Sequence, residues 1–331
     1  MVCAPTNKAV SVLCTRFLDS MPGSKVPCNV ILVGDEDKLL HGEGVATSGH
    51  RGRAAFEPSS KIRSVFLYTF VPTLLNDFGV LERYLKSTNR TFPPTKTGHP
   101  PKNHRCMCSL AQRLEWRLEH GLPGMVTEEL QGTLRKITTW FEQQQQESLQ
   151  ESLQDVLRWI HNVTLIIKGW KEEQVWSNLL QSAHIVFCTL TSAGASILKK
   201  SFGCSSSEVP STVTTTNSNN RCNNAISDLI VDEAAASTEP ELYIPFQFRP
   251  RRLLAVGDPK QLPASVSSPL CQKLGLDKSL QERLMYDRNY PYIVLDVQYR
   301  MKPTICQFPS NQFYSGKVSN GPNVRRCVLQ C

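Results

Sequence analysis

Two short apolar runs, each ending in acidic or polar residues, most constrain how this chain can fold. Residues 228–233 place Leu, Ile and Val before an Asp-Glu pair, and residues 255–263 run from Ala-Val into Gly-Asp-Pro-Lys-Gln-Leu-Pro. An apolar run bounded by turn residues is typical of a buried strand in a parallel sheet. Ligands of open α/β sheets bind outside the carboxyl ends of such strands. The expected site therefore contains four polar side chains, those of Asp232, Glu233, Asp258 and Gln261.

The adjacent carboxylates of Asp232 and Glu233 suit a magnesium–nucleotide site. One carboxylate can hold Mg²⁺, directly or through water, and the other can orient an attacking water. An Asp-Glu pair after a buried strand is common, so this motif becomes specific only in combination with the motifs C-terminal to it.

The composition is that of a folded chain with room for two domains, or for one large domain with an insertion. The 331 residues are 40% hydrophobic and 20% charged, which argues against global disorder. A net charge of +8 is compatible with nucleic-acid phosphates as partners. No membrane-spanning run or secretory signal is recognisable, so we expect an intracellular protein of the nucleus or the cytoplasm.

The 12 cysteines are scattered, which in an intracellular protein indicates reduced thiols. Cys106 and Cys108, close to His99 and His104, form the only cluster that suggests a metal. The cluster lacks the paired C-x₂-C spacing of structural zinc sites, so zinc is disfavoured there.

The N-terminal part predicts a strand, a helix and a second strand. Residues 2–4 and 30–33 are apolar, and Thr6 or Asn7 can cap a helix between them. The expected buried face of this helix consists of Val10, Leu13, Cys14 and Phe17.

The middle of the chain predicts helices between polar segments. Residues 36–64 and 88–105 are expected to be a loop and a linker. Residues 71–85 and 109–183 carry apolar side chains at helical spacing and lack a catalytic signature. We interpret this block as an accessory helical subdomain.

The C-terminal part returns to strand patterns. Residues 184–190 and 293–297 predict strands, and residues 269–287 predict a helix. Residues 203–224 are polar and predict a flexible loop. Three aromatic residues are expected to pack in a core rather than to bind ligand: Phe308, Phe313 and Tyr314.

Three motifs in a fixed order carry a family resemblance: Asp-Glu at 232–233, Gly-Asp-x-x-Gln-Leu-Pro at 257–263 and Gln-Tyr-Arg-Met at 298–301. Together they resemble superfamily 1 helicases, most closely the 1B subgroup with the nonsense-mediated-decay and senataxin-like helicases. The resemblance covers residues 2–35 and 184–320. It implies an α/β, RecA-like P-loop NTPase fold with a parallel sheet, a helical insertion and the start of a second RecA-like domain.

The resemblance also implies the domain order and the activity. The implied segments are 1–35 and 184–288 as the first RecA-like domain, 36–183 as a mainly helical insertion, and 289–331 as the start of a truncated second domain. The implied activity is ATP hydrolysis coupled to movement on single-stranded RNA or DNA, with ATP and Mg²⁺ as cofactors.

The resemblance assigns roles around ATP. Asp232 is expected to hold Mg²⁺, and Glu233 to activate the water that attacks the γ-phosphate. Gln261 is expected to sense the γ-phosphate, Tyr299 to stack on the adenine, and Arg300 to act as an arginine finger. The implied nucleotide-binding set is Asp232, Glu233, Asp258, Gln261, Tyr299 and Arg300.

Two segments are implied to contact nucleic acid. Pro5, Thr6 and Asn7 form a strand-end loop that opens a helix, where amides and hydroxyls can bind phosphate. Thr189 and Thr191 lie in the next contacting segment of the family. An ordinary capped turn is the alternative interpretation of each segment.

The chain departs from the family pattern in three ways. It contains no G-x-x-x-x-G-K-[ST] loop, which in the family precedes residues 4–10, and it stops before the later motifs. Ala236 stands where the family usually has Gln, which predicts weaker coupling between ATP and nucleic acid.

These departures leave two hypotheses for the activity. The chain is either a fragment of an ATP-dependent helicase or translocase, or a catalytically inactive nucleic-acid-binding remnant or adaptor. A different nucleotide-dependent α/β enzyme lacks motif support. The motifs do not distinguish RNA from DNA and name no protein partner.

Overall fold

The computed structural model describes most of the chain, in two compact units. The described residues are 1–21, 29–35, 38–39, 62, 65–88, 104–143, 153–203 and 226–325. The first unit comprises Met1–Asp232 and Pro240–Ala255, and the second comprises Glu233–Glu239 and Val256–Cys331. The predicted loop at 203–224 and most of the polar segments at 36–64 and 88–105 lie outside the described residues.

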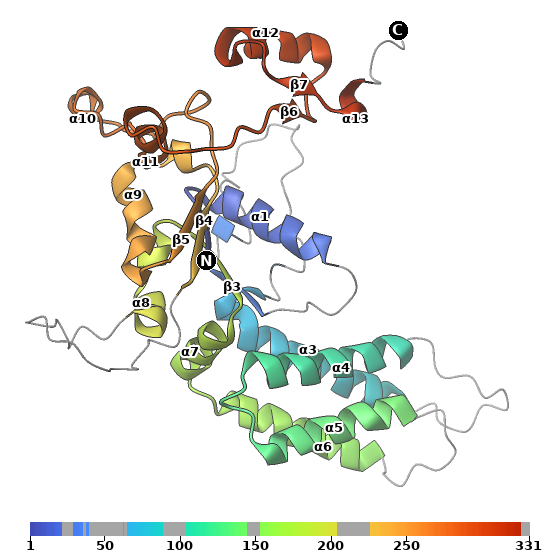
Figure 1. Cartoon of the computed structure of the whole chain (residues 1–331). Coiled ribbons are helices and arrows are strands. Elements are labelled where there is room, and N and C mark those ends of the chain that lie inside the picture. Colours follow the sequence, from blue (N-terminus) through green and yellow to red (C-terminus); the bar gives the residue numbers. More distant parts are fainter. Residues whose placement is uncertain are drawn as a thin grey trace, which may run out of the picture. The chain divides into compact units, whose positions relative to one another are not determined.

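The first unit is organised on a five-stranded sheet in which all neighbouring strands are parallel, in the order β2-β3-β1-β4-β5. The strands are β1 (Val2–Ala4), β2 (Val30–Val33), β3 (Ile185–Thr189), β4 (Asp228–Val231) and β5 (Arg252–Ala255). The strand register aligns Cys3 of β1 with Cys188 of β3 and with Val231 of β4. The sheet and its helices (Figure 1) confirm the predicted α/β fold with a parallel sheet.

The sheet packs against helix α1 (Asn7–Ser20). Thr6 caps this helix, because its hydroxyl accepts a hydrogen bond from the backbone N–H of Ala9 at 3.2 Å. The buried face differs from the prediction at the edges: Leu13 and Phe17 are only half-buried. The side chains that are fully buried are those of Val10, Ser11, Cys14 and Leu18.

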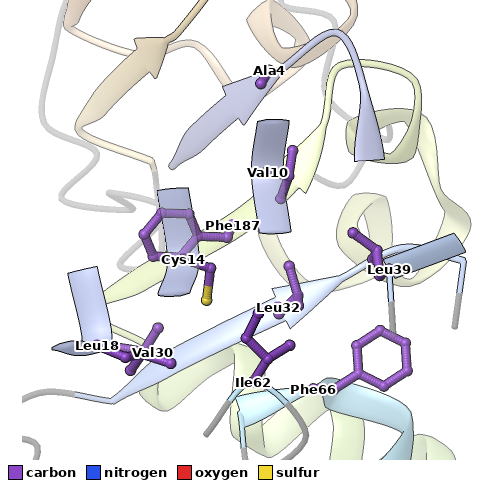
Figure 2. Close-up of a cluster of buried hydrophobic side chains, with 10 residues drawn as sticks. All are labelled: Ala4, Val10, Cys14, Leu18, Val30, Leu32, Leu39, Ile62, Phe66 and Phe187. Atoms are coloured by element: carbon purple, nitrogen blue, oxygen red, sulfur yellow. The ribbon is translucent and has the colours of Figure 1, made fainter. Parts of the chain in front are cut away.

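A single apolar cluster joins α1 and the sheet to the segment that precedes the helical block (Figure 2). Leu32 of β2 and Phe66 are both fully buried and form an isolated parallel β-bridge. Phe66 also packs edge-on against Tyr68, with the ring centroids 5.5 Å apart. Tyr68 in turn packs edge-on against Trp176 at 5.0 Å, so the helical block shares the core of the sheet.

The helical block lies between β2 and β3 in the sequence. Its elements are η2 (Leu67–Thr69), α3 (Phe70–Thr88), α4 (His104–Gly121), α5 (Glu128–Gln143), α6 (Leu153–Lys168) and α7 (Glu172–Ser182). Figure 1 shows α3, α4, α5 and α6 side by side. Each of these helices has a stripe of buried apolar side chains, as in a helical bundle. Among the described residues, no helix is long and apolar enough to cross a membrane.

Short helices connect the last strands of the first unit. They are η3 (Ser192–Gly194), α8 (Ser196–Phe202), η4 (Ala234–Ala236), α9 (Glu239–Tyr243) and η5 (Ile244–Phe248). The side chain of Gln247 fixes η5 against η3, because its amide nitrogen donates to the carbonyl oxygen of Ala193 at 3.0 Å. These connections return the chain to the amino end of the next strand, as a parallel sheet requires.

The second unit contains short elements. They are α10 (Pro269–Lys273), α11 (Leu280–Glu282), the π-helix η6 (Arg283–Asp287), β6 (Val297–Gln298), α12 (Pro303–Tyr314), β7 (Ser319–Asn320) and α13 (Pro322–Arg325). The predicted helix over 269–287 is wrong in its middle, because Gly275 takes a left-handed conformation with φ +82° that ends α10. Ser279 caps a new helix by accepting a hydrogen bond from the N–H of Glu282.

The predicted strand over 293–297 is wrong for residues 293–296. Only Val297 belongs to a strand, β6, which pairs in parallel with β7. Ile293 is 91% exposed and Leu295 85% exposed, so this apolar run has no partner strand among the described residues. An apolar run becomes a strand only where another strand accepts its backbone hydrogen bonds.

Candidate functional site

The carboxyl ends of β1, β3 and β4 present five of the predicted site residues. β1 leads into Pro5, Thr6 and Asn7, β3 ends at Thr189, and β4 leads into Asp232. The backbone N–H of Asp232 continues the sheet by donating to a carbonyl oxygen of β1 at 2.9 Å. The strand ends therefore form one edge of the sheet, where an α/β fold places its ligand.

Glu233 occupies a tight turn with an unusual backbone conformation. Its φ of 53° and ψ of 38° are left-handed, which costs a non-glycine residue about 1 kcal/mol. The next residue, Ala234, donates its N–H to the carbonyl oxygen of Val256 at 2.8 Å. A Cβ atom on Gly257 would lie 2.8 Å from the backbone nitrogen of Ala235. Gly257 is therefore the residue that lets the turn of Glu233 approach the loop after β5.

Replacing Gly257 by Ala should disturb the turn of Glu233. The added methyl group meets backbone atoms, which cannot move aside cheaply, so we expect a loss of about 1–3 kcal/mol in the free energy of unfolding. Urea denaturation measures the loss, and hydrogen exchange of residues 233–237 locates it. The matched control is Gly132→Ala in α5, where a Cβ meets nothing within 4 Å. This control should be neutral or slightly stabilising, and equal losses in both variants would contradict the close approach at Gly257.

The loop after β5 is organised by Asp258. Its carboxylate accepts hydrogen bonds from the side-chain amide of Gln261 at 2.9 Å and from the backbone N–H of Lys260 at 3.0 Å. It also accepts a short hydrogen bond from the hydroxyl of Tyr314 in α12. Partial burial raises the pKa of Asp258, but these hydrogen bonds outweigh it and hold the pKa below its ordinary value. The carboxylate is therefore ionised at neutral pH.

The Gln-Tyr-Arg-Met turn is held by the side chain of Gln298. Its amide oxygen accepts from the N–H groups of Arg300 at 2.9 Å and of Met301 at 2.7 Å. Its amide nitrogen donates to the carbonyl oxygen of Met301 at 2.7 Å and to the side chain of Asn320 in β7. The hydrogen-bonding groups of this side chain are thus all used, within the turn and with β7.

The same turn leaves Tyr299 and Arg300 exposed to solvent, with Tyr299 59% exposed. Gly321 packs directly against Tyr299, since a Cβ atom there would lie 2.3 Å from the aromatic ring. Asn323 adds a hydrogen bond from its side-chain amide to the carbonyl oxygen of Tyr299 at 3.0 Å. The backbone that carries the two exposed side chains is therefore fixed from several directions.

The two threonines of the predicted nucleic-acid segment differ in accessibility. Thr189 is buried, and its hydroxyl accepts a hydrogen bond from the backbone N–H of Ser192 at 3.0 Å. Thr191 is exposed. The expectation that both side chains contact nucleic acid is therefore narrowed to Thr191, because a buried hydroxyl cannot reach a phosphate. Thr189 shapes the turn in which Thr191 lies.

Two AAA-domain family models match this chain. The first matches residues 1–206 and 205–269, which is more than half of the chain, and the second matches residues 276–330. The chain belongs to the AAA-domain helicases of superfamily 1. The predicted resemblance to the nonsense-mediated-decay and senataxin-like helicases is confirmed.

Curated relatives of this helicase-family chain are much longer than the chain itself. It is 37% identical over 156 residues to the probable helicase MAGATAMA 3 of Arabidopsis thaliana, which is 47% of this chain and 16% of that protein. It is 35% identical over 155 residues to the human probable helicase senataxin, covering 44% of this chain and 5% of that protein. It is 43% identical over 96 residues to helicase SEN1 of Saccharomyces cerevisiae, covering 29% and 4%. The aligned part therefore spans 16% or less of these relatives.

Sequence reasoning missed the residues that support the candidate site. Gln298 stood in a predicted motif without a role, and Tyr314 was expected in a hydrophobic core. Phe308 is 71% exposed and Phe313 47% exposed, so the predicted core packing of these residues is wrong. The Asn-Gly pair that follows Ser319 in β7 was the available signal for a tight turn, yet its contact with Tyr299 depends on the tertiary structure.

Proposed function

We propose that this chain is part of an ATP-dependent helicase or translocase that moves on single-stranded RNA or DNA. The observation that carries the proposal is the succession of polar residues along the chain. Asp232 and Glu233 follow β4, and Asp258 and Gln261 follow β5. Tyr299 and Arg300 lie in a turn that Gln298 holds by hydrogen bonds. This succession matches the family to which the chain belongs.

Asp232 and Glu233 fit a Mg²⁺ ion, the metal that accompanies ATP. In the part of the chain that the structure describes, neither Asp232 nor Glu233 has an ion-pair partner, although both are accessible. Adjacent unpaired carboxylates at a strand end are suitable oxygen ligands for a hard cation. We propose that Asp232 holds Mg²⁺ and that Glu233 takes the proton of the attacking water. The bound metal would neutralise charge on the phosphates.

From the family resemblance, we propose nucleotide-binding roles for three residues of the second unit, Gln261, Tyr299 and Arg300. Gln261 and Arg300 are exposed and carry groups that bind phosphate oxygens, an amide in Gln261 and a planar guanidinium in Arg300. Tyr299 offers an exposed ring on which an adenine can stack. Asp258 orders the loop of Gln261 by accepting a hydrogen bond from its side-chain amide.

The proposed nucleic-acid surface is the strand-end edge with Pro5, Asn7 and Thr191. Thr6 belongs to it through the backbone, because its hydroxyl already caps α1. We further propose an intracellular location, in the nucleus or the cytoplasm. The described cysteines are free thiols, as a reducing compartment favours.

Replacing Thr191 by Ala tests the nucleic-acid surface. We expect the dissociation constant for single-stranded RNA or DNA to rise about threefold to tenfold, because one hydrogen bond to a phosphate is lost. Fluorescence anisotropy at a fixed salt concentration measures it, since phosphate contacts depend on salt. The matched control is Thr139→Ala on the exposed face of α5. If both variants bind as the unchanged chain does, Thr191 is not part of the surface.

The second candidate function is a catalytically inactive nucleic-acid-binding remnant or adaptor. The observation that favours it is Ala at position 236, where the family usually has Gln. Half-buried Ala236 offers no side-chain hydrogen bond in the turn after Glu233. Nucleic-acid binding without any nucleotide effect on its affinity would favour this second function.

A further inference from the structure

One cluster links the loop after β5 to helix α12 within the second unit. The carboxylate of Asp258 accepts hydrogen bonds from both Gln261 and Tyr314, and both donate to the same oxygen, Oδ2. Lys260 adds a second contact between the loop and α12, because its ammonium group donates to the carbonyl oxygen of Phe313 at 2.8 Å. The same ammonium group lies 5.7 Å from the centre of the Tyr314 ring. The loop and the end of α12 are therefore joined by three separate contacts.

The chemistry of Asp258 fixes the orientation of the Gln261 side chain. A carboxylate only accepts hydrogen bonds, so Gln261 must turn its NH₂ group towards Asp258 and its amide oxygen outwards. In this arrangement, Gln261 presents an acceptor to a ligand. To donate to an anionic oxygen, its amide has to leave Asp258.

The surroundings give Gln261 room for this movement. Its side chain is exposed and lies on the wall of an open cavity of about 470 Å³. Tyr314 cannot follow as freely, because it is half-buried at the end of α12. Partial burial and the bond to Asp258 raise the pKa of Tyr314 to about 12, so its hydroxyl remains a donor at neutral pH.

We propose that Tyr314 is a positioning residue that acts through Asp258: it sets the resting orientation of Gln261 and transmits the movement of Gln261 to α12. The proposal rests on the proposed function, because it takes the γ-phosphate of ATP as the ligand that competes with Asp258 for the Gln261 amide. When the Gln261 amide turns to the phosphate, Asp258 still accepts hydrogen bonds from the Tyr314 hydroxyl and from the backbone N–H of Lys260. Through these bonds, the movement of the loop is transmitted to α12.

The first part of the test needs no nucleotide. Hydrogen exchange is measured on the 331-residue chain, on its Tyr314→Phe variant and on Tyr290→Phe as a matched control, since Tyr290 is a 62%-exposed tyrosine of the same unit. In Tyr314→Phe, we expect exchange to rise about fivefold in both 256–264 and 303–316, the change expected from one lost hydrogen bond. Tyr290→Phe should change neither segment. Unchanged exchange in 256–264 of Tyr314→Phe would overturn the link.

The second part uses a form of this protein that contains a phosphate-binding loop, and adds Mg²⁺ and a non-hydrolysable ATP analogue in the presence of single-stranded RNA. In the unchanged chain, protection should change in both segments. In Tyr314→Phe and in Asp258→Asn, the response of 303–316 should be lost, which a purely structural role of Tyr314 does not predict. An intact response of 303–316 in Tyr314→Phe would overturn the transmission. If the nucleotide changes the exchange of no segment, the proposed function is contradicted. The first part of the test still decides whether Tyr314 and the loop after β5 are linked.

Discussion

Replacing Glu233 by Gln should lower nucleic-acid-stimulated ATP hydrolysis about a thousandfold in a form of this protein that contains a phosphate-binding loop. Glu233 is exposed, is held in a left-handed turn, and follows the buried strand β4. An amide has the shape of the carboxylate but cannot take a proton from water, and general bases of this kind contribute about 10²–10⁴-fold. Phosphate release in the presence of single-stranded RNA or DNA measures the loss.

The control for this prediction is Glu173→Gln, an exposed glutamate in the first turn of α7. It should leave hydrolysis and nucleotide binding unchanged. The 331-residue chain by itself should hydrolyse ATP only at background rate, because none of its residues form a G-x-x-x-x-G-K-[ST] loop. Robust hydrolysis by this chain, abolished by Glu233→Gln, would contradict the need for that loop.

The strands of the sheet could be predicted because their local sequence pattern agrees with their burial in the folded chain. Residues 229–231 are apolar, precede charged residues and belong to β4, which lies between β1 and β5 and buries Leu229 and Val231. Residues 30–33 are also apolar, and all four are buried. In such segments, local pattern and tertiary burial favour the same structure, so the pattern is sufficient.

The apolar run at 293–297 has the pattern of a strand, but most of it does not form one. Its composition is as strand-like as that of 30–33, yet Ile293, Val294 and Leu295 are 64–91% exposed. What differs is the partner, because β2 hydrogen-bonds to β3 whereas residues 293–295 pair with no strand in the described chain. Strand pairing is a non-local property that a single-sequence pattern does not contain.

Some residues of the candidate site could be predicted from the sequence, and others could not. Side chains at strand ends, such as Asp232 and Asp258, could be predicted because parallel strands bring their carboxyl ends to one edge. The residues that hydrogen-bond to these side chains could not be predicted. Tyr314 lies 56 residues from Asp258, and its apolar neighbours suggested a core position. Only the tertiary structure shows that its hydroxyl binds a carboxylate.

Replacing Phe66 by Ala should cost about 3–5 kcal/mol of the free energy of unfolding, a large part of the roughly 5–15 kcal/mol typical of a domain. Phe66 is fully buried, lies in the cluster with Leu32 and Ile62 (Figure 2), and packs against Tyr68. Removing its ring leaves a cavity at the point where the segment before α3 joins the sheet. Trp176, which contacts Tyr68, provides a fluorescence probe for urea denaturation.

The matched control is Phe308→Ala, because Phe308 has the same side chain at 71% exposure. It should change the free energy of unfolding by less than about 0.5 kcal/mol. A second, earlier transition in Phe66→Ala would mean that the helical block unfolds separately from the sheet. A single transition shifted to lower urea would mean that the block and the sheet form one cooperative core. Since Phe66, Tyr68 and Trp176 form a continuous chain of contacts from β2 to α7, we expect the single transition.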